Sequence, residues 1–154
     1  MDDISIKKKL WIHLGPGKSG STWIYNIAKN NQHIFYLPII KETQAFHSLS
    51  IFNHSFYNKK KTDSANIICD FSNTYIFNPI AISNLKKIGD DTNIEYLTTA
   101  LLRCPLKRTL SHYKYLISSG EISNLSFREL MAIEPSILWR SRYDIHIEHI
   151  KNFD

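Results

Sequence analysis

The chain has 154 residues, of which 43% are hydrophobic, and it contains only 5 Gly and 5 Pro. This composition excludes a disordered tail, a collagen-like repeat and a flexible linker, and it predicts a single domain over residues 1–154. The net charge of +5 is compatible with nucleic acid, a membrane surface or a small polyanion as the partner. No apolar run reaches the ~18 residues of a membrane span, and two cysteines, Cys69 and Cys104, give no disulfide framework, so we expect a cytoplasmic protein.

The first half of the chain predicts three strands and two helical segments. Leu10–Leu14 is a short apolar run that ends at glycine and proline, which is typical of a buried strand. Apolar residues at helical spacing predict a helix over Ser21–Asn30. Ile34–Leu37 predicts a second strand, Thr43–Phe56 a partly helical segment, and Ile67–Cys69 a third strand.

The second half predicts one strand and four helices. A helix over Pro79–Ile88 precedes Ile94–Leu102, a β-rich run that predicts a central strand. Further helices are predicted over Pro105–Ser118, Ser126–Ile133 and Ser136–Phe153. The first of these three has an apolar face formed by Leu106, Leu110, Tyr113 and Ile117. Strands that alternate with helices predict an α/β fold with a central parallel sheet and helices on both faces, whose ligands bind beyond the carboxyl ends of the strands.

A loop rich in glycine joins the first predicted strand to the first helix, with the sequence Gly15-Pro-Gly-Lys-Ser-Gly-Ser-Thr-Trp23. Glycines let the backbone turn tightly, and the amides at a helix N-terminus carry about half a positive charge. Lys18 adds a full positive charge. Hydroxyl donors come from Ser19, Ser21 and Thr22. The loop therefore predicts a phosphate or sulfate site.

Two other interpretations of this loop stay open. Gly17-Lys18-Ser19 matches the end of a Walker A loop, which binds ATP or GTP, but the first glycine of that pattern falls on Ile12. A nucleotide triphosphate site is therefore disfavoured without being excluded. The other interpretation is a tight turn with a solvated lysine.

The segment from Ile12 to Ile24 resembles the 5′-phosphosulfate loop of sulfotransferases, which use 3′-phosphoadenosine 5′-phosphosulfate (PAPS) as donor. The resemblance implies that Lys18 holds the bridging oxygen and the sulfuryl group. It also implies that backbone amides and hydroxyls of the loop bind the 5′-phosphate. The implied cofactor-binding residues are Gly17, Lys18, Ser19, Gly20, Ser21 and Thr22.

A second motif follows the fourth predicted strand and resembles the 3′-phosphate motif of the same family. That motif has an Arg at a strand end and a Ser eight residues later, as Arg103 and Ser111 are here. An arginine at a strand end can contact a phosphate with two donors. Cys104 stands where the family usually has Asp or Asn. Standing alone, the motif would instead suggest an arginine on a capping turn and a surface serine.

Two further segments resemble the acceptor side of the family. Lys41-Glu-Thr-Gln-Ala-Phe46 is similar to the Lys-Glu-x-x-Phe-Phe segment of heparan sulfate sulfotransferases, which implies that Glu42 is the catalytic base and that Lys41 contacts the substrate. An exposed Lys–Glu pair is the alternative, and His47 is the nearest alternative base. The turn that starts at Asp70 resembles the family's acidic-x-Ser-x-x-Tyr turn. This implies substrate contacts from Ser72 and Tyr75, with Phe71 where heparan-type members often have Lys.

The C-terminal region adds one similarity and one expectation about metals. Ser141-Arg-Tyr143 resembles a later Arg/Ser-x-Tyr helix start of the family, so the resemblance runs in order from Leu10 to Asp154. Family domains generally continue past this helix, so we expect a truncated or abbreviated enzyme. His146 and His149 have one-face helical spacing and predict a solvated helix face, with no metal site.

The resemblance implies a P-loop-like three-layer sandwich and a PAPS-dependent sulfotransferase of the carbohydrate branch. Lys18 and Glu42 are the implied catalytic residues, PAPS the donor and its bisphosphate, PAP, the product. The sulfuryl group would pass to a hydroxyl, in preference to an amine, of a carbohydrate-type acceptor. We expect no metal, nucleic-acid or membrane partner. The alternatives are a P-loop nucleotide kinase and a truncated nucleotide-binding module without turnover.

Overall fold

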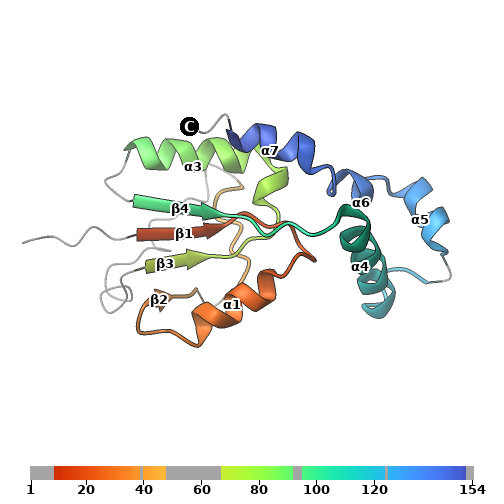
Figure 1. The fold of residues 1–154 in the computed structure, drawn as a ribbon, viewed down its shortest axis with the longest axis horizontal. Helices are drawn as coiled ribbons and strands as arrows, with labels where there is room; N and C mark the ends of the chain where they lie inside the picture. The colour runs from red at the N-terminus through yellow and green to blue at the C-terminus, as the bar shows by residue number, and fades with distance from the viewer. Residues whose placement is uncertain (1–8, 39, 48–66, 92–94, 124, 152–154) are drawn as a thin grey trace, which may run out of the picture.

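The fold is built on a four-stranded, all-parallel sheet with strand order β2-β3-β1-β4 (Figure 1). The computed structural model describes residues 9–38, 40–47, 67–91, 95–123 and 125–151. The strands are β1 (Lys9–His13), β2 (Phe35–Tyr36), β3 (Ile67–Asp70) and β4 (Glu95–Thr99). The predicted α/β class and parallel sheet are confirmed.

One prediction about the sheet is wrong. The run 94–102 was expected to form a central strand, but β4 pairs only with β1 and lies at the sheet edge within the described part of the chain. Leu97 is 61% exposed there. The interior positions belong to β3 and β1. β1 is hydrogen-bonded to β3 on one side and to β4 on the other, and it buries Leu10, Ile12 and His13.

Helices cover both faces of the sheet. On one face, apolar residues of β1 and β3 pack against the helix α3 (Pro79–Asp91); this cluster includes Leu10, Ile12, Ile68, Ala81, Ile82 and Leu85. On the other face, α1 (Ser21–Lys29) buries Ile24 and Ala28 against Cys69 and Phe71, next to the partly buried Trp11. The three-layer arrangement therefore follows from β1 and β3, whose successive side chains point to opposite faces.

The remaining helices are α4 (Pro105–Ser118), α5 (Phe127–Ile133), α6 (Ser136–Trp139) and α7 (Tyr143–Lys151), and a 3₁₀ turn, η3, spans Tyr75–Phe77. Figure 1 places α4, α5 and α6 beyond the carboxyl ends of the strands. Among the described helices, none combines the length and the apolar character that crossing a bilayer requires.

Three helix predictions need correction. The helix expected over 136–153 is two helices as far as residue 151, because the backbone turns at residues 140–142, where Arg140 ends α6; residues 152 and 153 lie outside the described residues. Within the partly helical segment, residues 44–47 form a turn closed by a hydrogen bond from the His47 amide to the Gln44 carbonyl, and residues 48–56 lie outside the described residues. Most of the apolar face of α4 is exposed, with Leu106 at 61% and Ile117 at 46%, although Tyr113 is half-buried; Arg108 and Thr109 are the residues that α4 buries.

Candidate functional site

The glycine–lysine loop lies at the carboxyl end of β1, where it turns into α1. Gly15 has φ +98°, and a side chain there would overlap the backbone carbonyl of Asn73, so only glycine fits. Gly20, with φ +110°, is the N-cap of α1 and has no side chain to cap the helix. The first amides of α1 are therefore left without a side-chain acceptor.

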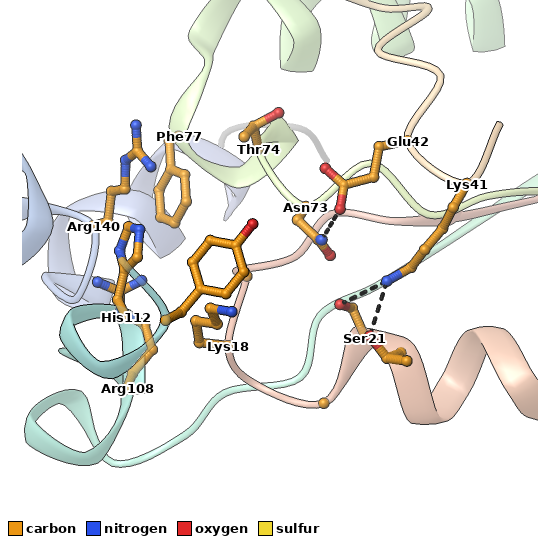
Figure 2. Close-up of a pocket in the computed structure, with 14 residues that line it drawn as sticks. Lys18, Ser21, Lys41, Glu42, Asn73, Thr74, Phe77, Arg108, His112 and Arg140 are labelled. Carbon is orange, nitrogen blue, oxygen red and sulfur yellow. Dashed lines mark hydrogen bonds between the residues drawn. The ribbon is translucent and has the colours of Figure 1, made fainter. Parts of the chain in front are cut away.

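A cavity of about 440 Å³ opens in front of this loop (Figure 2). It brings together seven of the predicted site residues, from two separate segments: Gly17, Lys18, Gly20, Ser21, Thr22, Lys41 and Glu42. The other lining residues come from the turn after β3, the end of the 3₁₀ turn that precedes α3, α4 and the C-cap of α6. The cavity is therefore a meeting point of elements that are far apart in the sequence.

Lys41 and Glu42 are both half-buried and both bound to neighbouring side chains. The Lys41 ammonium donates to Thr22 Oγ1 at 3.1 Å and to Ser21 Oγ at 3.5 Å, which ties it to the first turn of α1. Glu42 accepts a hydrogen bond from the amide of Asn73. Burial lowers the pKa of Lys41, and the charge of Glu42 acts in the opposite direction. The alternative of an exposed Lys–Glu pair does not describe this arrangement.

Lys18 points across the loop toward α4. Its backbone is in the left-handed region, with φ 69°. Its Nζ lies 3.4 Å from the centroid of the Tyr115 ring, which is cation–π geometry. Burial lowers the pKa of Lys18. The catalytic lysine implied by the resemblance thus faces an aromatic ring in the structure.

Three predicted donor-binding residues, Ser19, Arg103 and Ser111, do not line the cavity. The exposed guanidinium of Arg103 donates to the backbone carbonyl of Lys18 at 3.2 Å, which places the end of the β4–α4 connection against the loop. Ser111 is half-buried on α4. Ser19 Oγ is buried and has no hydrogen-bond partner in the described ranges. The proposed roles of these residues remain predictions.

Ser72 and Tyr75 are completely buried and do not line the cavity. The carboxylate of Asp70 accepts hydrogen bonds from the Ser72 amide (3.1 Å), the Ser72 hydroxyl (2.8 Å), the Tyr75 hydroxyl (2.6 Å) and Thr43 Oγ1 (2.7 Å). Burial raises the pKa of Asp70, and these four donors act against that rise. The buried network fixes the turn that carries Asn73 and Thr74 to the cavity wall. The substrate contacts predicted for Ser72 and Tyr75 remain predictions.

The histidines singled out from the sequence have structural partners. His47 does not line the cavity. Its Nε2 lies 3.0 Å from Thr74 Oγ1, and its ring packs against the ring of Tyr75. The predicted solvated face is wrong for His146, which is 1% exposed, donates to the Trp139 carbonyl at 3.0 Å and packs between aromatic rings. No group of three or more potential metal ligands gathers in the ranges that the structure describes.

Sequence reasoning missed half of the cavity lining, namely Asn73, Thr74, Phe77, Arg108, His112, Tyr115 and Arg140. One signal was available: Arg108, His112 and Tyr115 are spaced by four and three residues, so they share a face of α4. No such signal exists for Arg140, which reaches the cavity only because the chain turns between α6 and α7.

Comparison with known proteins adds no family to this geometry: the chain matches no protein-family model and no curated protein. The geometry itself defines a class of site, a cavity at the carboxyl edge of a parallel sheet whose lining includes the cationic side chains of Lys18, Lys41, Arg108 and Arg140.

Proposed function

We propose that the chain is a PAPS-dependent sulfotransferase that transfers a sulfuryl group to a hydroxyl of a carbohydrate-type acceptor. One observation carries the proposal: a glycine–lysine loop at a helix N-terminus shares one cavity with Lys41 and Glu42 from a separate segment. The loop supplies amides and a cation for an oxyanion, and Glu42 supplies a carboxylate beside it. The two cysteines are free thiols, which supports the cytoplasm as the proposed location.

In the proposed reaction the acceptor oxygen attacks sulfur in line with the leaving group. Glu42 takes the hydroxyl proton while the new O–S bond forms. The bond between sulfur and the 5′-phosphate oxygen breaks, and its electron pair stays on that oxygen in the bisphosphate product. A general base positioned in this way accelerates a reaction by about 10²–10⁴-fold. The hydrogen bond from Asn73 holds the Glu42 carboxylate in the cavity.

Lys18 and the loop amides stabilise the negative charge that develops on the leaving phosphate. Oriented donors of this type often provide the largest share of catalysis. Lys18 must turn from the Tyr115 ring toward the loop to serve this role. Arg103, beside the loop, and Ser111 are proposed to hold the 3′-phosphate, because a guanidinium offers two parallel donors to such a group.

Calorimetry tests donor recognition first. We expect the wild-type chain to bind adenosine 3′,5′-bisphosphate without a metal, and Lys18→Ala to weaken that binding and abolish sulfuryl transfer. Lys29→Ala, an exposed lysine at the end of α1, is the matched control and should behave as wild type. Tight binding of ATP that requires Mg²⁺, with none of the bisphosphate, would instead establish a nucleotide kinase and reject the proposal.

A sulfate-transfer assay tests the proposed role of Glu42 as the base. Glu42→Gln keeps the shape of the side chain and removes the base, so sulfate transfer to a panel of oligosaccharides should fall by about 10²–10⁴ while bisphosphate affinity is retained. Glu134→Gln, an exposed carboxylate at the end of α5, is the control. Bisphosphate binding without transfer to any acceptor by the wild-type chain would identify a binding module that lacks turnover.

A further inference from the structure

Asp70, at the end of β3, is a buried carboxylate that no cation neutralises in the described part of the chain. Its side chain is 0% exposed, and none of the ion pairs among the described residues includes it. It does not line the cavity either. Burying a carboxylate costs free energy that an apolar side chain of similar volume would not cost. A role in arranging other residues accounts for a carboxylate at this position.

The two oxygens of this carboxylate hold two different segments. Oδ1 accepts hydrogen bonds from the amide and the hydroxyl of Ser72, which precedes Asn73 in the turn after β3. Oδ2 accepts a hydrogen bond from Thr43 Oγ1 at 2.7 Å, and Thr43 directly follows Glu42. Each oxygen therefore holds the chain neighbour of one partner in the hydrogen bond between Asn73 and Glu42, which Figure 2 shows.

A further contact joins the same two segments one residue later. The backbone amide of Gln44 donates to Ser72 Oγ at 2.9 Å. Gln44 has φ 52°, in the left-handed region that residues other than glycine adopt infrequently. Conformations of this kind persist where the surrounding contacts hold them, and they cluster at functional sites. The chain is therefore fixed in an uncommon conformation two residues after Glu42.

The sheet connects this arrangement to the glycine–lysine loop. Asp70 is the last residue of β3, and it pairs with Ile12 of β1, whose end leads into the loop. The segment that carries Glu42 and the loop that carries Lys18 are thus both attached to the same pair of hydrogen-bonded strands. Sites that are fixed to strands hold their geometry more precisely than sites on loops.

We propose that Asp70 is a positioning residue for the general base: through Thr43 and Ser72 it fixes the Glu42 carboxylate against Asn73 at the cavity wall. This inference rests on the proposed function, in which Glu42 takes the acceptor proton. A displacement of about 1 Å at a reacting group can cost on the order of 10²-fold in rate. Asp70 acts on the reaction only through the place that it gives to Glu42.

Thr43→Val tests the link, because it keeps the shape of the side chain and removes the hydroxyl that donates to Asp70. We expect kcat for sulfate transfer to fall by about 10- to 10²-fold, while KM for the acceptor and the affinity for adenosine 3′,5′-bisphosphate change by no more than about twofold. Thr43→Ser keeps the hydroxyl and should restore most of kcat. Asp70 itself is not replaced, because its buried donors would then lose their acceptor.

A second measurement does not depend on turnover. The side-chain amide of Asn73 donates to Glu42, so the NMR resonance of this amide in the full chain reports where the carboxylate lies. Thr43→Val should shift the resonance in the same direction as Glu42→Gln does. Thr43→Ser should leave it near its wild-type position.

Thr99→Val is the matched control. Thr99 is also half-buried, and its hydroxyl accepts a hydrogen bond from another segment, from Trp11 Nε1 at 2.8 Å. This variant removes a comparable hydrogen bond on β4, and urea unfolding measures the stability that each variant loses. We expect Thr99→Val to keep the wild-type kcat and the wild-type Asn73 resonance.

An unchanged kcat or an unchanged Asn73 resonance in Thr43→Val would overturn the positioning role. So would a loss of kcat that Thr99→Val reproduces or that Thr43→Ser fails to restore, because it would not come from the hydroxyl that Asp70 holds. Weaker bisphosphate binding by Thr43→Val would mean that the segment places Lys41 at the donor loop instead, and would overturn it too. If the wild-type chain transfers no sulfate, the proposed function fails, and the Asn73 resonance alone decides whether Asp70 places Glu42.

Discussion

Lys18 is the residue whose placement bears most directly on ligand binding. Its ammonium, 3.4 Å from the Tyr115 ring centroid, gains a cation–π contact of about 0.5–1 kcal/mol at a partly exposed site. In the proposed reaction the same ammonium turns to the loop when the donor binds. The aromatic contact therefore stabilises the unbound arrangement and opposes binding.

Replacing the ring should relieve this competition. We expect Tyr115→Leu to tighten adenosine 3′,5′-bisphosphate binding by about two- to fivefold, the equivalent of the lost cation–π contact. Calorimetry provides the measurement, with Tyr115→Phe as the control that keeps the ring and the wild-type affinity. Weaker binding by the Leu variant alone would mean that the ring holds Lys18 in its binding position.

His13, at the end of β1, makes stability depend on pH. It is completely buried, with Nδ1 3.3 Å from Thr99 Oγ1, and burial lowers its pKa to about 4. The unfolded chain takes up this proton near pH 6.5, so it binds more protons than the folded chain between pH 6.5 and 4. Stability is therefore lost as the pH falls through this window, by an amount on the order of 3 kcal/mol from His13.

Urea unfolding at a series of pH values checks this expectation. His13→Gln should flatten the difference in unfolding free energy between pH 6.5 and pH 4, whatever its effect at neutral pH. His33→Gln, with an exposed side chain, serves as the control. An unchanged slope in the His13 variant would contradict the assignment.

At the scale of elements, the loop between β1 and α1 is shaped by the turn after β3. Gly15 lies directly against the backbone of Asn73, whereas a methyl group on Gly17 would meet Asn73 Cβ at an ordinary 3.6 Å. The two glycines are two residues apart and have different roles. Gly15 is required by the packing of the loop against the turn after β3, and Gly17 leaves room in front of the loop.

This difference predicts unequal costs for the same substitution. Gly15→Ala should lower the free energy of unfolding by more than about 2 kcal/mol, because it combines a disfavoured φ with overlap of the Asn73 carbonyl. Gly17→Ala should change it by less than about 1 kcal/mol. Chemical denaturation of both variants is the measurement. Similar stabilities would mean that the loop and the turn separate readily.

For the whole molecule, the cavity lies where the sheet meets the layer formed by α4 and α6. A ligand there contacts β1's loop, the turn after β3 and α4 together, so its binding stabilises the folded chain as a unit. Four of its side chains, Lys18, Lys41, Arg108 and Arg140, are cationic, against one carboxylate, Glu42. An anionic ligand therefore has a large electrostatic advantage that salt should weaken.

Thermal unfolding tests this linkage. Adenosine 3′,5′-bisphosphate at 100 times its dissociation constant should add about 2.7 kcal/mol and raise Tm by on the order of 5–10 °C. At the same ligand concentration, Arg103→Ala should lose much of the rise, because it mainly weakens donor binding. Arg128→Ala, an exposed arginine on α5, should keep it. An equal rise in Tm for both variants would show that Arg103 does not contribute to donor binding.

The local sequence determined the parts of the protein that depend on neighbouring residues. The alternation of apolar runs with segments of helical spacing predicted the α/β class and the parallel sheet, because parallel strands need helices as connections. The bounds of α4 were also predicted, although the apolar positions that marked this helix are mostly exposed. The same local pattern identified the glycine–lysine loop between β1 and α1. Whether that loop binds PAPS stays a prediction.

Only the tertiary structure decided which distant residues meet. It placed β4 at the sheet edge, divided the predicted final helix at Arg140, and turned Ser72 inward to the Asp70 carboxylate. It also brought Arg140 to the face of α4 that carries Arg108. These outcomes depend on packing and hydrogen bonds between segments tens of residues apart, which no local pattern records. Length, composition and a +5 charge pointed to an anionic partner, and the fold placed four cationic side chains, Lys18, Lys41, Arg108 and Arg140, in one cavity.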